Sequence, residues 1–195
     1  IWQVKGAPQQ LIDELLQGAY ACKDSVENNG RSNEGGYQSP PFDWDQFHPE
    51  GIQYVEDIVK KEVKEEGEDA EISKAKWWYN INPTGGWNKP HTHPGVDLAA
   101  VLYLTDTQGE LAFMPPHNRS IGMNRGYQSM HCKKGDFIIF PSDIIHMVLP
   151  NKSEEDRVSI SMNINVNLEP LPIKRTETKA VKDLYNEACE GLEIT

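Results

Sequence analysis

Two closely spaced histidines are the first residues whose types suggest chemistry. His91 and His93 are separated by one residue and follow the turn-forming run Pro83-Thr84-Gly85-Gly86. In an extended segment, residues i and i+2 project to the same side, so both imidazoles could bind one metal ion. Two solvated loop histidines would show the same spacing. The pair alone therefore leaves a metal site and an exposed loop equally open.

A third histidine, His146, follows an apolar run, a proline turn at Pro141 and a second apolar segment. An imidazole buried there needs a partner, because an unpaired buried polar group costs on the order of 1–3 kcal/mol. A metal ion is one such partner, and a backbone carbonyl is the alternative. Together with His91 and His93, His146 gives three candidate metal ligands.

Arg157 follows His146 with ten residues between them, across a polar turn. If the flanking strands pair as a hairpin, Arg157 lies near His146 on the neighbouring strand. Strand alternation then places the polar side chains Arg157, Ser159, Ser161 and Asn163 on one face and the apolar Val158, Ile160, Met162 and Ile164 on the other. A polar inner face suits a barrel that holds a ligand, and arginine binds carboxylates through two hydrogen bonds. An exposed hairpin arginine is the alternative.

The elements that position these residues follow from hydrophobic periodicity. Helical spacing predicts an amphipathic helix after Pro8 that ends before Asn28, and a second helix from Ile52 to Gly67, with a loop over 30–50 between them. From Ala70 onwards, short runs rich in β-branched and aromatic residues predict strands at 73–81, 98–105, 110–114, 136–140, 144–149 and 157–167. The pattern at 176–192 predicts a terminal helix.

Helices followed by a run of antiparallel strands favour a mainly β barrel or sandwich with helices packed outside. The length of 195 residues suits a single domain over 1–195. We expect an N-terminal helical part at 1–69, a β core at 70–167, and a C-terminal tail with a helix at 168–195.

Composition excludes several kinds of partner. The formal net charge of −11 argues against nucleic acid, which proteins bind through Lys and Arg placed near phosphates. The chain has no apolar run near the ~20 residues that span a bilayer, so we expect no membrane segment. The three cysteines, Cys22, Cys132 and Cys189, are widely spaced and odd in number. They predict no disulfide framework and favour a reducing, cytoplasmic location.

Taken in order, these segments resemble the 2-oxoglutarate- and Fe(II)-dependent oxygenase superfamily. The sequence is most similar to a branch of uncharacterised putative oxygenases marked by an HxH pair, a tyrosine-containing strand and a late FP…H…R-x-S segment. The similarity covers about half of the chain. The residues that carry it are Trp78-Tyr79-Asn80, Lys89 to Gly95, Val101-Leu102-Tyr103-Leu104, Phe113-Met114-Pro115, Phe140 to His146 and Arg157-Val158-Ser159.

The resemblance implies a double-stranded β-helix, also called a jelly-roll or cupin-like barrel, that holds Fe(II) between His91, His93 and His146. It implies that Arg157 and Ser159 bind the cosubstrate 2-oxoglutarate, with ascorbate as a reductant, and that Asn80 and Tyr103 reach the same pocket. His93 departs from the family, because the second position usually carries Asp or Glu. A neutral imidazole there leaves the bound iron one charge unit more positive.

A second resemblance, to cupins, rests on glycine spacing. Gly85 precedes His91 by five intervening residues, and Asp97 follows His93 by three, with Asp in place of the usual Glu. Asp97 would then be a fourth ligand, and the activity would be cosubstrate-free dioxygenation, isomerisation or binding alone. We prefer the oxygenase interpretation, because the cupin interpretation assigns no role to Arg157 and Ser159.

The expected partners are 2-oxoglutarate, O2 and an unidentified substrate. Hydroxylation with release of succinate and CO2 is the expected reaction. The similarity of Lys89-Pro90-His91 to prolyl hydroxylases slightly favours a peptidyl substrate over a free amino acid, a lipid or another small molecule. A non-catalytic barrel that binds a partner is a third hypothesis, and the sequence does not determine the oligomeric state.

Overall fold

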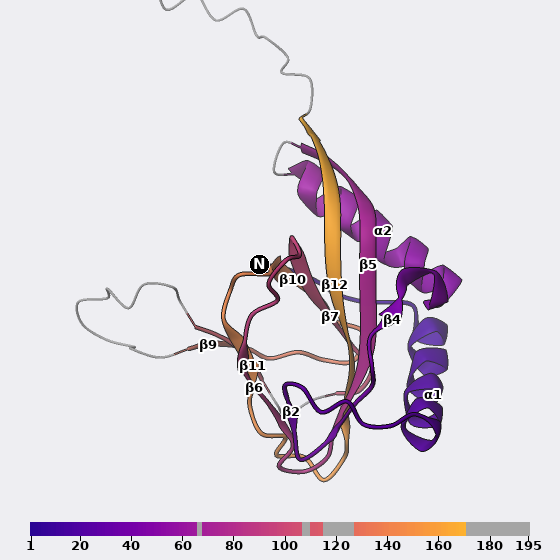
Figure 1. Ribbon diagram of the computed structural model, residues 1–195, viewed down its shortest axis with the longest axis vertical. Coiled ribbons are helices and arrows are strands. Elements are labelled where there is room, and N and C mark those ends of the chain that lie inside the picture. The colour runs from indigo at the N-terminus through magenta and orange to yellow at the C-terminus, as the bar shows by residue number, and fades with distance from the viewer. Residues whose placement is uncertain (66–67, 107–109, 115–126, 171–195) are drawn as a thin grey trace, which may run out of the picture.

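The computed structural model describes residues 1–65, 68–106, 110–114 and 127–170, and it is built from two antiparallel sheets and two α-helices (Figure 1). The elements in chain order are β1 (Trp2–Val4), α1 (Gln9–Ser25), β2 (Asn33–Glu34), β3 (Tyr37–Gln38), β4 (Phe42–Asp43), the 3-10 helix η1 (Trp44–Gln46), α2 (Pro49–Glu65), β5 (Glu68–Asn82), β6 (Trp87–His91), β7 (Leu98–Tyr103), β8 (Leu111–Phe113), β9 (Gln128–Met130), β10 (Phe137–Pro141), β11 (His146–Val148) and β12 (Arg157–Pro170).

The larger sheet has seven strands in the order β1-β10-β7-β12-β5-β3, with β4 also paired to β5. The smaller sheet has five strands in the order β2-β6-β11-β8-β9. Neighbouring strands in each sheet are often far apart in sequence, as when β12 lies between β7 and β5. The predicted mainly β architecture is therefore confirmed.

Both faces of the larger sheet are buried. Along β7, Leu98, Ala100 and Leu102 belong to one apolar cluster, while Ala99, Val101 and Tyr103 belong to the other. The second cluster also contains residues of β8 in the smaller sheet, so it lies between the sheets. This arrangement explains why β7 is apolar at every position, since a strand that is covered on both faces has no side exposed to water.

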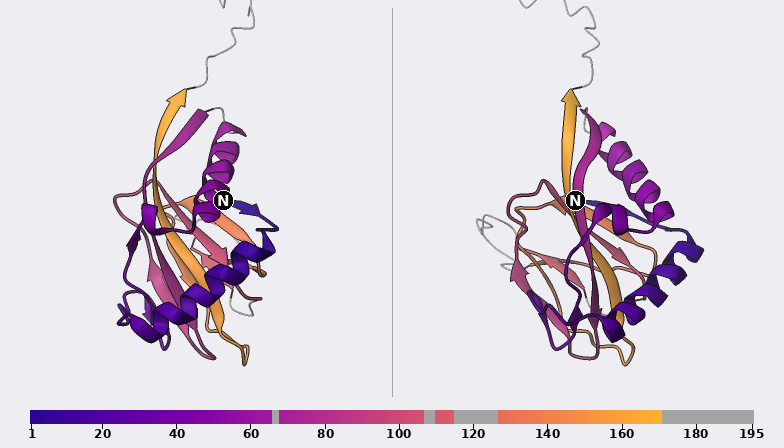
Figure 2. Two further views of the ribbon diagram at one scale, coloured as in Figure 1. Left: turned by 90° about the vertical axis from the view of Figure 1, so that its right-hand side faces the viewer. Right: turned by 45° about the vertical axis from the view of Figure 1, so that its right-hand side comes forward.

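The two helices cover the outer face of the larger sheet. Leu11, Ile12 and Leu15 of α1, and Val55 and Val59 of α2, are buried in the same cluster as the outer residues of β5, β7, β10 and β12. Figure 2 shows both helices on this one side of the sheet. The prediction of two amphipathic helices outside the barrel is confirmed, and the predicted inward and outward alternation along β12 is also found.

Two local predictions are wrong. The segment 30–50 is not only loop, because it contains β2, β3, β4 and η1. These short strands pair with β5 and β6, which are distant in sequence, so local propensity gave no sign of them.

The predicted hairpin between the strands that carry His146 and Arg157 does not form. β11 pairs with β6 and β8, whereas β12 pairs with β5 and β7. The connection at 149–156 crosses from one sheet to the other instead of folding back within one sheet. The predicted helix at 176–192 lies outside the described residues, and the domain boundaries stay a prediction.

Candidate active site

His91 and His146 are brought together by strand pairing in the smaller sheet. His91 is the last residue of β6, His146 is the first residue of β11, and the two are direct register partners. His93 follows β6 by two residues, and its backbone N–H donates to the carbonyl of Ser142 at 2.9 Å. Gly85 makes the turn into β6 with φ of 81°, a left-handed conformation that favours glycine.

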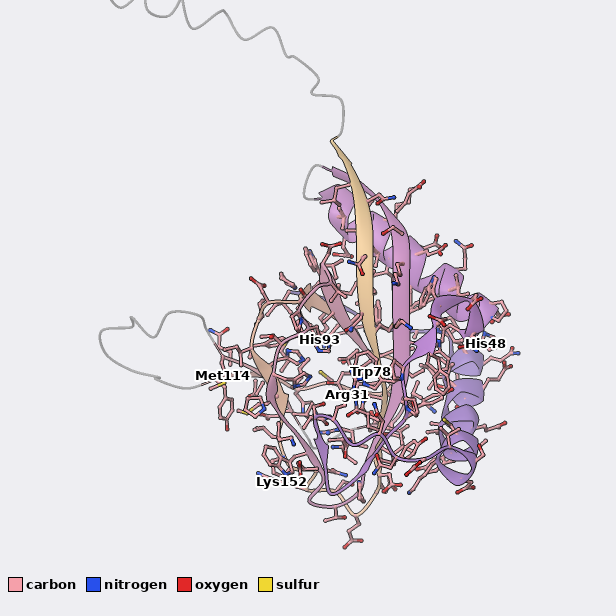
Figure 3. The ribbon with its side chains drawn as sticks, viewed as in Figure 1. Arg31, His48, Trp78, His93, Met114 and Lys152 are labelled. Atoms are coloured by element: carbon pink, nitrogen blue, oxygen red, sulfur yellow. The ribbon has the colours of Figure 1, made fainter. Side chains whose placement is uncertain are left out.

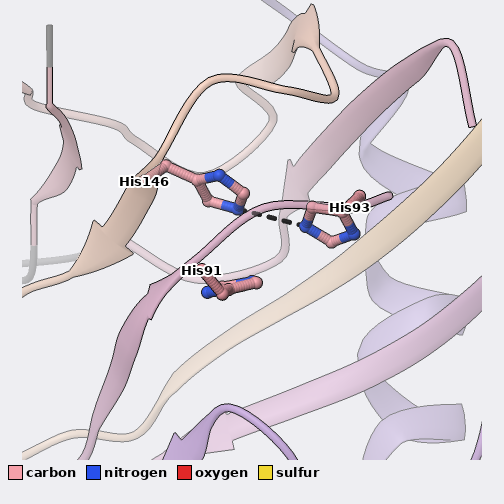
Figure 4. Close-up of side chains that lie close together, drawn as sticks. All are labelled: His91, His93 and His146. Atoms are coloured by element: carbon pink, nitrogen blue, oxygen red, sulfur yellow. Dashed lines mark hydrogen bonds between the residues drawn. The ribbon is translucent and has the colours of Figure 1, made fainter. Parts of the chain in front are cut away.

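The three imidazoles converge on one point (Figure 4). One ring nitrogen of each lies within 4.8 Å of the others, and Nε2 of His93 is 3.1 Å from Nε2 of His146. Two nitrogens bound to one ion at ~2.1 Å and at a right angle would lie about 3.0 Å apart. The arrangement thus has the dimensions of a facial metal site with its opposite side open.

Backbone carbonyls set the orientation of two of these rings. Nδ1 of His91 donates to the carbonyl of Lys89 at 2.7 Å, and Nδ1 of His146 donates to the carbonyl of Ile144 at 2.9 Å. Because a carbonyl only accepts, the proton lies on Nδ1 and the lone pair of Nε2 points into the site. Both rings are therefore held in the tautomer that a metal ion requires.

Burial keeps the three histidines uncharged. It lowers the pKa of His146 to about 3 and the pKa of His93 to about 4. Repulsion by a protonated His91 lowers both pKa values further. Burial also lowers the pKa of His91, although its hydrogen bond to Lys89 opposes the shift. Neutral imidazoles at pH 7 can bind a metal without first losing a proton.

Asp97 is not part of this cluster among the described residues. Its Oδ2 accepts a hydrogen bond from the backbone N–H of Val166 at 2.9 Å, which ties it to β12. The geometry therefore favours His93 over Asp97 as the third donor.

Arg157 reaches the same interior cavity from the opposite sheet. The cavity is lined by His91, His93 and His146 at one side and by Arg157, Ser159 and Ser161 of β12 at the other. Arg157 is register partner to Asn82 on β5 and is only 2% exposed. A cation and a set of metal ligands thus share one enclosed space between the sheets.

The guanidinium of Arg157 has neutral partners. It donates to the carbonyl of Leu149 at 3.2 Å, and its Nη2 lies 2.9 Å from the amide of Asn82 and 3.5 Å from that of Asn88. No carboxylate pairs with it among the residues that the structure describes. Burial lowers its pKa to about 10, so it stays charged at pH 7. A buried charge without a counterion is costly, and an anionic ligand would remove that cost.

The remaining predicted cosubstrate residues line this cavity as well. Ser159, Asn80 and Tyr103 are all buried there, and the amide of Asn80 donates to the hydroxyl of Ser161 at 2.9 Å. Burial raises the pKa of Tyr103 well above its usual value, so its hydroxyl stays neutral. The structure brings all seven predicted site residues together, and their individual roles stay predictions.

Three further residues belong to the site but were not predicted as such. Asn82 and Asn88 contact Arg157, and Trp78 stacks on His93 with ring centroids 5.8 Å apart. Alternation along β5 places Trp78, Asn80 and Asn82 on one face, which was the available signal for two of them. Nothing in the sequence pointed to Asn88, because β6 was not predicted as a strand.

An outer cleft of about 510 Å3 lies next to the interior cavity. The two share Ser32, Trp78, His91 and His93 in their walls. His91 and His93 therefore line both the small interior cavity and a cleft that opens to the surface, which is the arrangement that a substrate would need to approach an ion held by these histidines.

Fold and site together define a double-stranded β-helix with three histidines arranged as a candidate facial metal site. Residues 76–163 match the model of a family described as putative 2OG-Fe(II) oxygenase. This range contains the three histidines, Arg157 and Ser159. The barrel core of the chain is thus similar to the 2-oxoglutarate- and Fe(II)-dependent oxygenases, and the predicted resemblance is confirmed. No curated protein matches the sequence.

Solved structures of that class share the fold. A prolyl-4-hydroxylase from Pseudomonas putida is 16% identical, with a TM-score of 0.61 over 84% of this chain and 91% of its own. A Trichoplax adhaerens prolyl hydroxylase bound to a hypoxia inducible factor peptide is 17% identical, with a TM-score of 0.60 over 84% and 82%. The α-ketoglutarate-dependent epimerase SnoN from nogalamycin biosynthesis is 14% identical, with a TM-score of 0.59 over 90% and 80%. The predicted double-stranded β-helix is confirmed.

Among the described residues, no helix has both the length and the apolar character to cross a bilayer.

Proposed function

We propose that this protein hydroxylates its substrate with Fe(II), O2 and 2-oxoglutarate, releasing succinate and CO2. One observation carries the proposal: three neutral imidazoles line the same cavity as a buried arginine that has no carboxylate partner among the described residues. The three imidazoles suit a divalent cation. The arginine suits the far carboxylate of a dicarboxylate that is chelated to that cation.

His91, His93 and His146 would hold the iron through Nε2, with the carbonyls of Lys89 and Ile144 fixing two of the rings. When bound, iron and 2-oxoglutarate supply the oxidising chemistry, in which O2 and the cosubstrate together deliver one oxygen atom to substrate. Because all three ligands are neutral, the iron would keep its full double charge. That charge strengthens its attraction to the anionic cosubstrate.

Arg157 would anchor the far carboxylate through its planar fork, and Ser159, two residues along the same face of β12, would donate a further hydrogen bond. Asn80 and Tyr103 stay uncharged in this cavity and would position the cosubstrate without competing for Arg157. Burial of the whole set excludes water from the reacting atoms.

The outcome on substrate is part of the proposal. Hydroxylation is supported by the shared fold of the prolyl hydroxylases, whereas an epimerase shares that fold too. A peptidyl substrate is supported by the Lys89-Pro90-His91 similarity. We further propose ascorbate as the reductant and a reducing, cytoplasmic location, which the odd number and wide spacing of the three cysteines support.

The test is succinate formation from 2-oxoglutarate by anaerobically iron-loaded protein, given O2 and ascorbate without added substrate. Arg157→Ala is the matched variant, since it removes the cation but no metal ligand. We expect slow uncoupled turnover in the wild type, its loss in the variant, and unchanged iron content in both. Metal binding without any turnover would contradict the proposal and favour cosubstrate-free cupin chemistry.

A further inference from the structure

The outer cleft has a charge opposite to that of the chain as a whole. Arg31, Lys76 and Lys89 line it, and no acidic residue lines it within the part of the chain that the structure describes. The chain carries 30 acidic and 19 basic residues, for a net charge of −11. The walls of this cleft therefore carry basic side chains on a negative molecule, and a cation there that is not neutralised by a carboxylate would attract anions.

Two of these cations are already paired. Nζ of Lys76 lies 2.9 Å from Oδ1 of Asp43, and Nζ of Lys89 lies 2.6 Å from Oε1 of Glu34. Arg31 makes no ion pair or hydrogen bond with the described residues. Its guanidinium is thus the cation in this cleft that is available to an incoming anion, and its planar fork matches a carboxylate or phosphate.

Part of the remaining cleft wall is apolar and suits an apolar portion of a ligand. Trp78, which stacks on His93, forms part of the wall, together with Pro41, Pro90 and Pro94. Figure 3 shows Arg31, Trp78 and His93 in the same part of the molecule, and all three line the cleft. A volume of about 510 Å3 is within the range of pockets that take small ligands.

From this juxtaposition we propose that the substrate carries a carboxylate or phosphate group, which Arg31 binds at the cleft, while an apolar portion lies along Trp78 towards the metal ligands. The inference rests on the proposed function, since it assigns the substrate class of the same site. Either a free amphipathic acid or an acidic residue of a peptide could supply the anionic group.

The experiment measures binding of the fluorescent apolar anion 8-anilinonaphthalene-1-sulfonate to the full chain at low salt. Arg31→Glu reverses the free charge, and Lys152→Glu makes the same change at an exposed loop residue that lines no described cleft. We expect about five- to tenfold weaker dye binding for Arg31→Glu and less than twofold change for Lys152→Glu. The difference should shrink in 0.5 M salt, because screening weakens an exposed charge pair.

Displacement of the dye then identifies the source of the group. Indole-3-propionate should displace it better than the neutral indole-3-propionamide; displacement by acetyl-Glu-Pro-Glu-amide instead would support the peptide source. Equal displacement by acid and amide, displacement by none of the three, or wild-type dye binding in Arg31→Glu would overturn the proposal. These measurements need neither iron nor 2-oxoglutarate, so their failure is distinct from failure of wild-type succinate formation.

Discussion

Burial has opposite consequences for charge at the two ends of the interior cavity. At the histidine end, burial removes charge: the imidazoles are neutral, and Nε2 of His93 lies 3.1 Å from Nε2 of His146. At the arginine end, burial leaves a full charge in place, held by the amides of Asn82 and Asn88 and a carbonyl. One end suits a cation and the other suits an anion.

This contrast shows how a single apolar barrel can select a charged pair of ligands. Each end favours a ligand of one sign, because neutral imidazole nitrogens suit a cation and an anion removes the cost of a buried guanidinium that has neutral partners. The residues at the two ends also belong to different sheets. A ligand that contacts both ends must therefore span the space between the sheets. The predictions below disturb one end at a time.

The largest effect is expected at the histidine end. His146→Ala removes the most buried of the three candidate ligands and should weaken metal binding roughly 100-fold or more, with loss of succinate formation. Metal titration with Co(II) and its visible absorption measures this directly. A folded variant that still binds Co(II) as the wild type does would contradict the assignment of the site.

The ion-free protein should lose stability as the pH falls from 7 to 5. His93 and His146 have pKa values of about 4 and about 3 in the fold, against ~6.5 unfolded, so the unfolded state takes up protons first. The unfolding free energy should fall by about 2–4 kcal/mol in total over this window. Urea unfolding in a chelator measures it, with His146→Gln as the control that removes about half of the pH dependence. An equally steep dependence in that variant would show that other groups are responsible.

At the arginine end, Asn82→Asp tests whether the missing counterion matters. Asn82 is fully buried, and Nη2 of Arg157 is 2.9 Å from its amide. A carboxylate there would pair with Arg157 and compete with the cosubstrate, so affinity for 2-oxoglutarate should fall roughly tenfold while the fold is not weakened.

Cosubstrate affinity in this variant can be followed by the absorption of the anaerobic iron complex, and stability by urea unfolding. Asn82→Leu is the control that removes the amide without adding charge. If the aspartate variant binds 2-oxoglutarate as tightly as the wild type, Arg157 is not the anion receptor.

The smallest effect is expected at Asn151, which connects two turns of the backbone. Its side chain donates to the carbonyls of Asn82 at 2.9 Å and Glu155 at 2.8 Å, and so joins the turn before β6 to the one before β12. Asn151→Ala should cost about 1–3 kcal/mol of unfolding free energy, because one buried and one partly buried carbonyl lose their donor. Thermal unfolding measures this loss, with Lys152→Ala at the exposed neighbouring residue as the control. Equal stability of the two variants would contradict the prediction.

Much of the site was predictable because its key patterns are local. The spacing of His91 and His93 and the alternation along β12 from Arg157 to Ser161 depend only on the geometry of an extended chain. The helices over 9–25 and 49–65 were equally clear, since an amphipathic face of four or five turns repeats many times.

What failed was long-range. β6 was missed because its five residues include polar residues and a proline, Pro90, and its pairing with β2 and β11 is what makes it a strand. The short strands β2, β3 and β4 were missed for the same reason. Their propensity is weak, and partners distant in sequence stabilise them.

The sequence by itself determined which residues of a single strand project from the same side, and thus which side chains could act as metal ligands or bind an anion. Only the tertiary structure decided that His146 and Arg157 come from opposite sheets, and that Arg31 of a distant loop lines the same cleft as His91 and His93. The physical reason is that side-chain direction follows from backbone geometry within a few residues. The choice of strand partners depends instead on how the whole chain buries its apolar faces.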